Sequence, residues 1–316
     1  MVLIFAETWN GTFKKSTLEA VQYGAACAKS LGTHAAAVVF GATTEDLAAL
    51  GGHGAQRVIH VTGAASFEPL AYGQMLASIA REENAQLVVV SGTTNGKSLT
   101  PLVSAALDAP AVTNVLALPH SFSPLTVRRG AFSSKGLEDA VAHGSTTVLC
   151  IVPNAIGMAP AGTDSASIAP HSAAATGKTQ LVEQQIASGK IPLPEAERVV
   201  SAGRGMKGPE NWNLIEALAQ ELNAGTACSK PVSDIGWRPH SEHVGQTGIQ
   251  INPQLYIAVG ISGAIQHLAG VSSSKTIVVI NSDPEAPFFK AADYGVVGDA
   301  FDVVPKLTEA LRAFHA

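Results

Sequence analysis

Short apolar runs that alternate with helical patterns constrain the fold of this chain more than any other feature of its sequence. Residues 2–6, 35–40 and 87–91 are apolar almost throughout, and residues 70–81 have helical spacing. Strands that are buried on both faces have this composition, and helical connections place them in parallel order. We therefore predict an α/β protein whose N-terminal half holds a parallel sheet covered by helices on both faces.

Two local patterns in this half give more detailed expectations. Ser16-Thr17-Leu18-Glu19 has the form of a capping box, with a hydroxyl at the helix start and a carboxylate three residues later. Residues 154–179 are rich in Ala, Ser, Gly and Pro, which favours a surface loop or linker. Residues 181–183 are a candidate for the last strand of this half.

A proline-rich segment, Gly189-Lys190-Ile191-Pro192-Leu193-Pro194, favours an extended connection. We place a domain boundary there, with a first domain at 1–191 and a second at 192–316. The strand and helix alternation restarts in the second domain. Its predicted strands are 198–201, 255–259, 276–280 and 295–297, and its closing helix is 303–314.

Composition and charge exclude several classes of protein. Apolar residues make up 46% and charged residues 14% of the chain, which argues against a disordered, highly charged protein. The net charge is −5 and no basic stripe stands out, so nucleic acid and anionic membrane surfaces are not expected partners. The longest charge-free stretch, 244–274, is broken by Gly, Pro and polar residues, so we expect no membrane insertion.

The cysteines and the N-terminus bear on the cellular compartment. Cys27, Cys150 and Cys228 are far apart and odd in number, which is typical of free thiols in a reducing compartment. Met1 runs directly into Val2-Leu3-Ile4-Phe5, without the basic region of a signal peptide. We expect a bacterial cytoplasmic protein, in preference to a processed chain of the mitochondrial matrix.

The glycine-rich turn Gly260-Ile261-Ser262-Gly263-Ala264 is the strongest local signal for a ligand. It follows a predicted strand and opens a predicted helix, where backbone N–H groups and the helix dipole favour a diphosphate. Asn281 and Asp283 end the next strand, where a ribose-binding group is expected. Gly203-Arg204-Gly205 forms a second such turn. Together they predict a dinucleotide at the carboxyl ends of the strands, and an ordinary tight turn is the alternative.

Two other patterns suggest different chemistry. Gly260-x-Ser262-x-Ala264 resembles a weakened nucleophile elbow with His267 nearby, which keeps a serine hydrolase open. His240 and His243 have H-x-x-H spacing, but a metal site needs three or four ligands that converge. We expect solvated loop histidines and no metal.

The second domain resembles the FAD-binding α (large) subunit of electron transfer flavoprotein. The matching blocks come in the order and spacing of that family, and the N-terminal half is similar more loosely, at Ile4-Phe5-Ala6-Glu7 and Leu107-Asp108-Ala109-Pro110. The blocks are Val199-Val200-Ser201-Ala202-Gly203-Arg204-Gly205, Val244-Gly245-Gln246-Thr247-Gly248, Leu255-Tyr256-Ile257-Ala258-Val259-Gly260-Ile261-Ser262-Gly263-Ala264-Ile265-Gln266-His267, Asn281-x-Asp283-Pro284-x-Ala286-Pro287 and Ala292-Asp293-Tyr294-Gly295.

The resemblance implies a fold, a cofactor and partners. The N-terminal domain would be a nucleotide-hydrolase-like parallel-sheet domain that packs with a β subunit, and the C-terminal domain a doubly wound FAD-binding domain. One FAD would lie on this chain and AMP on the partner β subunit. The heterodimer would carry electrons in fatty acid β-oxidation, from flavin dehydrogenases such as acyl-CoA dehydrogenases to a membrane quinone oxidoreductase. It would be a carrier without net catalysis on a small substrate.

The resemblance also implies roles for individual residues. Arg204 would contact FAD, Thr247 would offer its hydroxyl to flavin N5, and His267 would face the flavin C2 carbonyl. The ribityl-diphosphate would lie along residues 262–266, and Asn281 and Asp299 would hold the ADP half. The full implied cofactor-binding set is Arg204, Ser229, Lys230, His243, Val244, Gly245, Gln246, Thr247, Gly260, Ser262, Gly263, Ala264, Ile265, Gln266, His267, Asn281, Asp299 and Ala300.

Three residues depart from the family pattern. Lys230 stands where Arg is usual, which keeps the charge but loses the planar fork. His243 replaces a common Gln, and its titration would make the flavin potential depend on pH near neutrality. Ile249 replaces a frequent Lys and would alter the rim that partners touch. An FAD- or NAD-dependent oxidoreductase with its own substrate and a cofactor-free scaffold are the alternative functions.

Overall fold

The computed structural model divides into two compact units, which are described separately. It describes residues 1–64, 66–132, 135–172, 174–175, 177–179, 181–183 and 191–315. The first unit is Met1–Ala131 with Leu137–Ile186, and the second is Phe132–Gly136 with Ala187–Ala316. Residues 184–190, which include Gly189 and Lys190 of the predicted linker, lie outside the described residues. The domain boundary between 191 and 192 stays a prediction.

The first unit is an α/β domain built on one ten-stranded sheet, with the order β10-β9-β7-β11-β6-β1-β4-β5-β12 and with β8 attached to β9. Its strands are β1 (Val2–Phe5), β4 (Ala35–Phe40), β5 (Arg57–Val61), β6 (Leu87–Ser91), β7 (Ala111–Val115), β8 (Ser121–Phe122), β9 (Leu125–Ala131), β10 (Gly136–Ala142), β11 (Thr147–Ile151) and β12 (Ser167–His171). Its helices are α1 (Lys15–Ser30), α2 (Pro69–Glu82), α3 (Thr94–Leu107) and the 3-10 helix η1 (Leu47–His53). A separate small hairpin pairs β2 (Thr8–Trp9) with β3 (Thr12–Phe13).

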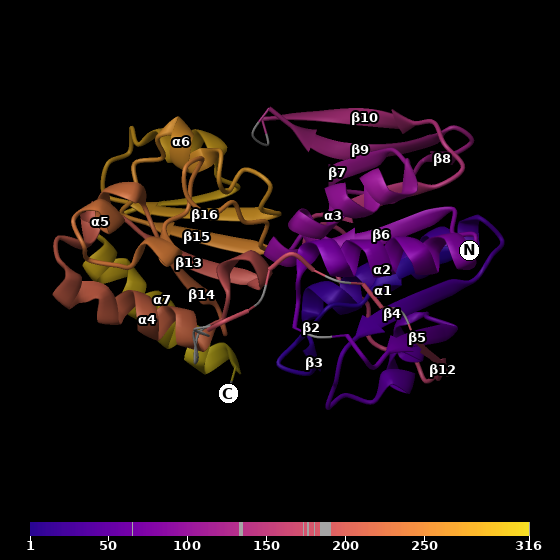
Figure 1. Ribbon diagram of the computed structural model, residues 1–316. Coiled ribbons are helices and arrows are strands. Elements are labelled where there is room, and N and C mark those ends of the chain that lie inside the picture. The colour runs from indigo at the N-terminus through magenta and orange to yellow at the C-terminus, as the bar shows by residue number, and fades with distance from the viewer. Residues whose placement is uncertain are drawn as a thin grey trace. The chain divides into compact units, whose positions relative to one another are not determined.

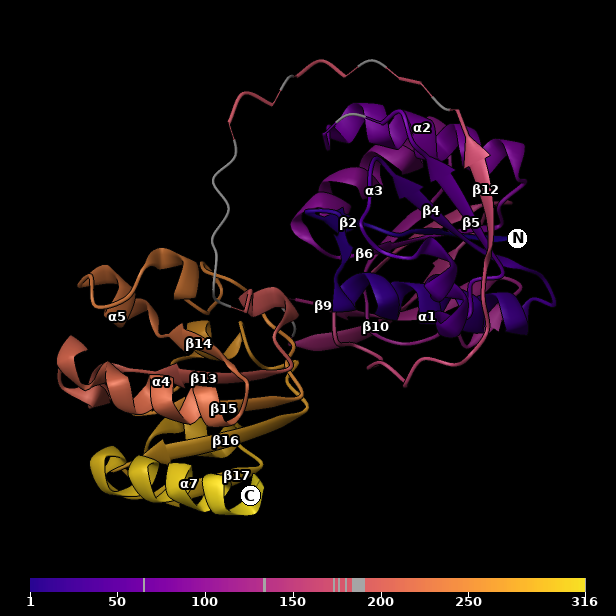
Figure 2. The same cartoon turned by 90° about the horizontal axis from the view of Figure 1, so that it is seen from below.

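The core of this unit lies on both faces of the sheet, as the apolar runs predict. The central strand β1 pairs in parallel with β4 and β6, and every residue of these three strands is buried. One apolar cluster packs α1 and η1 against the sheet, and the other packs α2 and α3 against the opposite face. Figure 2 shows α1 on one side of the strands and α2 and α3 on the other. Full burial of each large aliphatic side chain stabilises the fold by about 1.5–3 kcal/mol.

The capping-box prediction at the start of α1 is wrong. The helix begins at Lys15, and Ser16 and Glu19 lie in its first turns instead of forming the cap. Glu19 is buried, and its carboxylate accepts hydrogen bonds from the backbone N–H groups of Asn154, Ile156 and Gly157 at 2.6, 3.1 and 3.1 Å. Burial raises the Glu19 pKa, and these hydrogen bonds oppose the rise. The carboxylate therefore anchors the loop after β11, a contact between segments that local spacing does not reveal.

The predictions for residues 154–183 are also wrong in two places. β12 lies inside the segment that was expected to be loop, and it pairs in parallel with β5. Residues 181–183 do not form a strand. β12 is an edge strand that contains Pro170, a residue that edge strands tolerate. β12 pairs with β5 through backbone hydrogen bonds, which do not require apolar side chains. Its sequence therefore lacks the apolar pattern from which the other strands were predicted.

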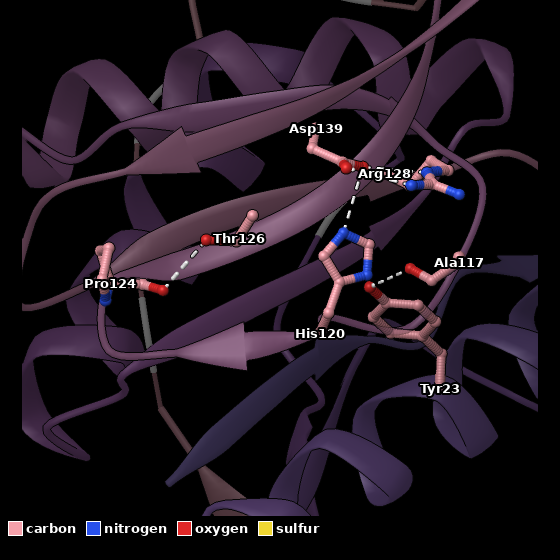
Figure 3. Close-up of polar contacts among 7 residues, drawn as sticks. All are labelled: Tyr23, Ala117, His120, Pro124, Thr126, Arg128 and Asp139. Carbon is pink, nitrogen blue, oxygen red and sulfur yellow. Dashed lines mark hydrogen bonds and ion pairs between the residues drawn. The ribbon is translucent and has the colours of Figure 1, made fainter.

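An antiparallel extension widens one side of the first sheet. β7 and β9 pair in antiparallel fashion. Asp139 on β10 accepts two hydrogen bonds from Arg128 on β9, at 2.9 and 3.0 Å, and lies 3.1 Å from His120 Nε2 (Figure 3). The Arg128 hydrogen bonds lower the Asp139 pKa to about 2. This exposed ion-pair network ties β10 to the neighbouring strand.

The second unit is a doubly wound domain on a five-stranded parallel sheet with the order β14-β13-β15-β16-β17 (Figures 1 and 2). Its strands are β13 (Arg198–Ala202), β14 (Gly225–Cys228), β15 (Leu255–Val259), β16 (Thr276–Asn281) and β17 (Tyr294–Val297). Its α-helices are α4 (Trp212–Glu221), α5 (Lys230–Asp234), α6 (Ile265–Leu268) and α7 (Ala300–His315). Its 3-10 helices are η2 (Leu193–Glu195), η3 (Arg204–Met206), η4 (Pro209–Asn211), η5 (His240–Glu242) and η6 (Pro287–Ala291).

The strand order of the second unit creates a crevice at one edge of its sheet. From β13 the chain passes to β14 on one side and then to β15 on the other, which is a topological switch point. Open α/β sheets bind ligands outside the carboxyl ends of the strands at such a point. α4 and α7 cover one face of this sheet (Figure 1). Among the described residues, no helix is long and apolar enough to cross a membrane.

Candidate functional site

A cavity of about 450 Å³ lies at the switch point of the second unit. Its walls come from the turns that follow β13, β14 and β15, and from the loop that leads into Thr247. Most of the residues predicted to bind a cofactor meet here. The lining is Gly203, Arg204, Ser229, Lys230, Pro231, His243, Val244, Gly245, Gln246, Thr247, Gly260, Ile261, Ser262, Ala264, Gln266 and His267.

Two glycine turns form the floor of this crevice by direct backbone contact. Gly203 N–H donates to the Val259 carbonyl at 2.9 Å, and Gly205 N–H donates to the Gly260 carbonyl at 3.1 Å. A Cβ on Gly203 would lie 2.3 Å from the Gly260 oxygen, and a Cβ on Gly260 would lie 2.8 Å from Gly205 Cα. Gly260 also has a φ of +59°, which disfavours other residues. Glycine at these positions therefore lets the two turns pack together.

Gly263 has a similar role on the next turn. A Cβ there would lie within 2.5–2.6 Å of the Phe288 Cβ, Cα and backbone nitrogen. The sequence predicts that glycines 260 and 263 allow the close approach of a diphosphate to the backbone at a helix N-terminus. In the structure, Gly260 packs against Gly205 and Gly263 against Phe288, too closely for a Cβ. The helix that follows, α6, is only four residues long. A single helical turn has a small dipole, so that part of the phosphate argument does not apply.

His267 is a buried, neutral imidazole in the cavity wall. It is 7% exposed, and the distance between its Nε2 and the Tyr256 hydroxyl is 2.7 Å. Burial lowers the His267 pKa to about 4, the neighbouring His243 acts in the same direction, and the Val244 backbone opposes them. Its Nδ1 is buried and has no hydrogen-bond partner among the described residues. The ring therefore has one nitrogen held by the core and one that is still unsatisfied.

His243 is the second imidazole of the cavity. It is 2% exposed, its Nδ1 also has no partner in the described part of the chain, and its ring centroid lies 5.3 Å from that of His240. Burial lowers the His243 pKa, the charges of His240 and Lys230 add to this, and Asp234 opposes it. The titration expected near neutrality is therefore moved to more acidic pH.

Exposed polar side chains complete the lining. Arg204 and Lys230 bring two cations to the turns after β13 and β14, and Thr247 brings an accessible hydroxyl. Gln246 N–H donates to the Gln266 carbonyl at 2.7 Å, which joins the loop of Thr247 to α6. Cations beside backbone amides and hydroxyls suit a ligand that carries phosphates and carbonyl groups.

Five residues of the predicted set do not line the cavity: Gly263, Ile265, Asn281, Asp299 and Ala300. The Asn281 side chain donates to the Ile261 carbonyl at 2.9 Å and accepts from Asp283 N–H at 3.0 Å. Asp299 accepts from Phe301 N–H at 2.9 Å and lies 3.7 Å from Lys207 Nζ, so it holds the start of α7.

Pro231 lines the cavity and was missed by the prediction, whereas Gly203 and Ile261 belong to the two predicted glycine turns but not to the implied cofactor-binding set. Each adjoins a predicted residue in the chain, and their position on strand-to-helix turns is the signal that could have identified them.

The alternative sites receive no support from this geometry. Nε2 of His267 contacts the Tyr256 hydroxyl, so in the described part of the chain this histidine is not paired with the Ser262 hydroxyl as a base. The ring contact between His240 and His243 has no third ligand: the described residues contain no group of three His, Cys, Asp or Glu side chains that could hold a metal.

Comparisons with known proteins cover both units. The Electron transfer flavoprotein domain matches residues 2–183, and the Electron transfer flavoprotein FAD-binding domain matches residues 192–272. The electron transfer flavoprotein subunit alpha of Pseudomonas aeruginosa is 35% identical over 98% of this chain and 99% of its own length. The chain belongs to the electron transfer flavoprotein α subunit family. Subunits of the same name from Syntrophomonas wolfei and Bacillus subtilis are 36% and 32% identical, over 98% and 99% of this chain and 98% of each relative.

The cavity of this electron transfer flavoprotein α subunit fits the chemistry of FAD. The cations Arg204 and Lys230 suit a diphosphate, and the buried Nδ1 atoms of His243 and His267 lack partners that the polar edge of a flavin could supply. A buried polar atom without a hydrogen bond costs about 1–3 kcal/mol, so such atoms in a cavity wall point to a bound ligand. The cavity also lies within the second unit, where the FAD-binding domain matches.

The lowered pKa of His267 predicts a stability that depends on pH. In the unfolded chain His267 takes up a proton near its ordinary pKa of 6.5, whereas the folded chain resists protonation until about pH 4. Stability is therefore full above pH 6.5 and is lost as the pH falls from 6.5 to 4, by about 2 kcal/mol at pH 5 for this group. We expect His267→Gln to remove most of this dependence.

Urea unfolding of the cofactor-free chain at pH 7 and pH 5 measures this effect. Trp212 and Trp237 lie in the second unit and Trp9 in the first, so fluorescence in a Trp9→Phe background reports the second unit. Equal loss of stability on acidification in the parent and in His267→Gln would contradict the assignment.

Proposed function

We propose that this α subunit binds one FAD and pairs with an electron transfer flavoprotein β subunit that carries AMP. The heterodimer accepts electrons from flavin dehydrogenases, such as acyl-CoA dehydrogenases of fatty acid β-oxidation, and passes them to a membrane quinone oxidoreductase. In this role the chain is an electron carrier and has no small substrate of its own. A bacterial cytoplasmic location stays a prediction, which the bacterial relatives support.

One observation carries the proposal: a cavity lies at the switch point of the second unit, and cations and unsatisfied imidazoles line it. In this proposal Arg204 and Lys230 hold negative charge on the cofactor, and Thr247 offers its hydroxyl to flavin N5. Of residues 262–266, Ser262, Ala264 and Gln266 line the cavity and lie along the ribityl-diphosphate. Bound FAD supplies the reversible electron chemistry.

His267 has an electrostatic role in this proposal. A neutral N–H donor beside the flavin C2 carbonyl stabilises negative charge as it develops there, and the dry wall strengthens the interaction. Because the His267 pKa is near 4 without cofactor, this donor is neutral across the physiological range. The ring then supplies a dipole whose strength does not depend on pH between about 6 and 8.

The test is an absorbance spectrum of the chain co-expressed with its β subunit, followed by stepwise reduction. We expect a bound-flavin spectrum and reduction in two resolved one-electron steps. Reduction in a single two-electron step would favour an oxidoreductase with its own substrate. Failure to bind flavin after reconstitution with FAD would leave a cofactor-free scaffold as the better explanation.

Substitution of Lys230 by Arg tests the contribution of this cation. Lys230 lines the cavity at the start of α5. A guanidinium keeps the charge and adds a planar fork that stacks on aromatic rings, for about 1 kcal/mol. We expect Lys230→Arg to raise the first one-electron potential of the flavin. Potentials measured on both heterodimers by reductive titration decide this, and no difference beyond error would discard the role.

A further inference from the structure

Tyr256 lies directly behind His267 and contacts it through its hydroxyl. Tyr256 is on β15 and is completely buried, and its oxygen lies 2.7 Å from His267 Nε2. Phe288 packs against both rings, with centroid distances of 6.2 Å to Tyr256 and 5.7 Å to His267. His267 lines the cavity and Tyr256 does not. Nε2 is therefore occupied by the buried Tyr256 hydroxyl, and Nδ1 is the ring nitrogen that can contact a ligand.

The protons of this pair leave two possible arrangements of the hydrogen bond between Tyr256 and His267. Burial raises the pKa of Tyr256, so its hydroxyl keeps its hydrogen, and His267 is neutral with a single N–H. If Tyr256 donates to Nε2, that hydrogen is satisfied and the N–H of His267 lies on Nδ1. If Nε2 were the donor instead, the buried tyrosine hydrogen would need another acceptor.

The surroundings of the pair favour Tyr256 as the donor. Ser201 on β13 lowers the Tyr256 pKa, and its own hydroxyl has no hydrogen-bond partner that meets geometric limits among the described residues. The Val244 backbone raises the His267 pKa, which is the effect of a carbonyl that attracts a ring N–H, and Nε2 faces Tyr256 instead. The effect of Val244 agrees with a hydrogen bond that Tyr256 donates to Nε2. That hydrogen bond places the hydrogen of His267 on Nδ1.

We propose that Tyr256 is a positioning residue that holds His267 in the Nδ1–H tautomer and in a fixed orientation, so that the cavity offers a neutral N–H donor to a carbonyl oxygen of its cofactor. The inference rests on the proposed function. The unsatisfied Nδ1 supports it, because a carbonyl that gains negative charge on reduction is the partner this atom lacks. A second group commonly sets the tautomer of a functional histidine through its other nitrogen.

The first test reads the tautomer directly, on the full chain paired with its β subunit. The side-chain nitrogens of selectively ¹⁵N-labelled histidine are assigned through a His267→Gln sample. We expect His267 to show a protonated Nδ1 and an unprotonated Nε2, both with and without FAD. A protonated Nε2 in the parent complex would overturn the inference, and this measurement needs no Tyr256 variant.

The second test removes the tyrosine hydroxyl while it keeps the ring. In Tyr256→Phe we expect a mixture of His267 tautomers, an FAD dissociation constant raised about tenfold, and a lower flavin potential. The matched control is Phe288→Leu, which disturbs the same packing and leaves the Tyr256–His267 hydrogen bond in place. The control should lose stability but keep the Nδ1–H tautomer.

The outcomes separate the inference from the proposed function. If the parent complex binds no FAD, the proposed function fails, while the nitrogen shifts of His267 still report its tautomer. If FAD binds but Tyr256→Phe leaves the shifts, the dissociation constant and the potential unchanged, Tyr256 has only a packing role and the inference is wrong.

Discussion

Gly263→Ala is expected to destabilise the second unit by about 4 kcal/mol. The new Cβ would lie 2.5–2.6 Å from the Cβ, Cα and backbone nitrogen of Phe288, where backbone cannot easily yield. Phe288 N–H is also held by the Ser262 carbonyl at 3.1 Å, so separation of the two segments breaks a hydrogen bond. Overpacking costs about 1–3 kcal/mol, and the φ of +82° adds roughly 1–2 kcal/mol for a residue other than glycine.

Gly236→Ala is the matched control for this prediction. Gly236 has a φ of +77° and nothing within 4 Å of an added Cβ, so its substitution carries the backbone cost without the clash. We expect a loss of about 1 kcal/mol there. Urea unfolding followed by Trp212 and Trp237 fluorescence in the Trp9→Phe background compares the two variants. Equal losses would show that the Phe288 backbone moves aside and that the clash has little effect.

The close contact between Gly263 and Phe288 also helps to set the shape of the cavity. Ser262 and Ala264 line the cavity, and Gly263 between them is pinned against Phe288. Phe288 in turn packs on the rings of Tyr256 and His267. The contact of Gly263 with Phe288 therefore fixes the turn after β15 relative to the His267 ring. We expect Gly263→Ala to weaken FAD binding as well as to lower the stability of the second unit.

The strands were predictable from the sequence where burial alone defines them. β1, β4 and β15 are continuous apolar runs because both faces of a parallel sheet are covered. β12 carries Ser, Pro and His on an exposed edge, and its pairing with β5 is a backbone interaction. Side-chain composition contains no signal for such a strand.

The candidate site was predictable as a set of turns, but the reasons for its residues were not. Arg204 and His267 meet in one cavity because they follow the neighbouring parallel strands β13 and β15, and the loop between η5 and β15 brings Thr247 to them. Glu19 was assigned to a helix cap from local spacing, whereas its partners lie near residue 155. The contact of Gly260 with Gly205 likewise joins distant segments. Spacing along one segment cannot show contacts that form only when two segments meet.

Arg238→Met is the second substitution with a large expected effect, a loss of about 3 kcal/mol in the second unit. Arg238 Nε and one terminal nitrogen donate to the two Glu242 oxygens at 2.7 and 2.8 Å, and the side chains are 14% and 7% exposed. The guanidinium also lies 5.4 Å from the centre of the Trp212 ring. Loss of one partner from a buried ion pair costs about 3–5 kcal/mol, because the remaining charge stays away from water.

The double variant Arg238→Met/Glu242→Met distinguishes charge burial from loss of packing. Removal of both charges avoids a buried carboxylate that has lost its Arg238 partner, so it should be less destabilising than Arg238→Met alone. Glu216→Gln is the matched surface control, since Glu216 contacts the same Arg238 at 3.0 Å but is 53% exposed. We expect a change of about 0.5 kcal/mol or less there.

The ion pair between Arg238 and Glu242 holds the turn η5, which leads directly into the loop that carries the cavity residues His243 to Thr247. Glu242 ends η5, and His243 N–H donates to the His240 carbonyl at 3.0 Å, so rotation of this turn would move both His243 and Thr247. We therefore expect Arg238→Met to raise the FAD dissociation constant as well as to lower stability, whereas Glu216→Gln should change neither. Fluorescence titration with FAD measures this directly. Unchanged FAD affinity in a destabilised Arg238→Met variant would mean that the loop keeps its conformation without the ion pair.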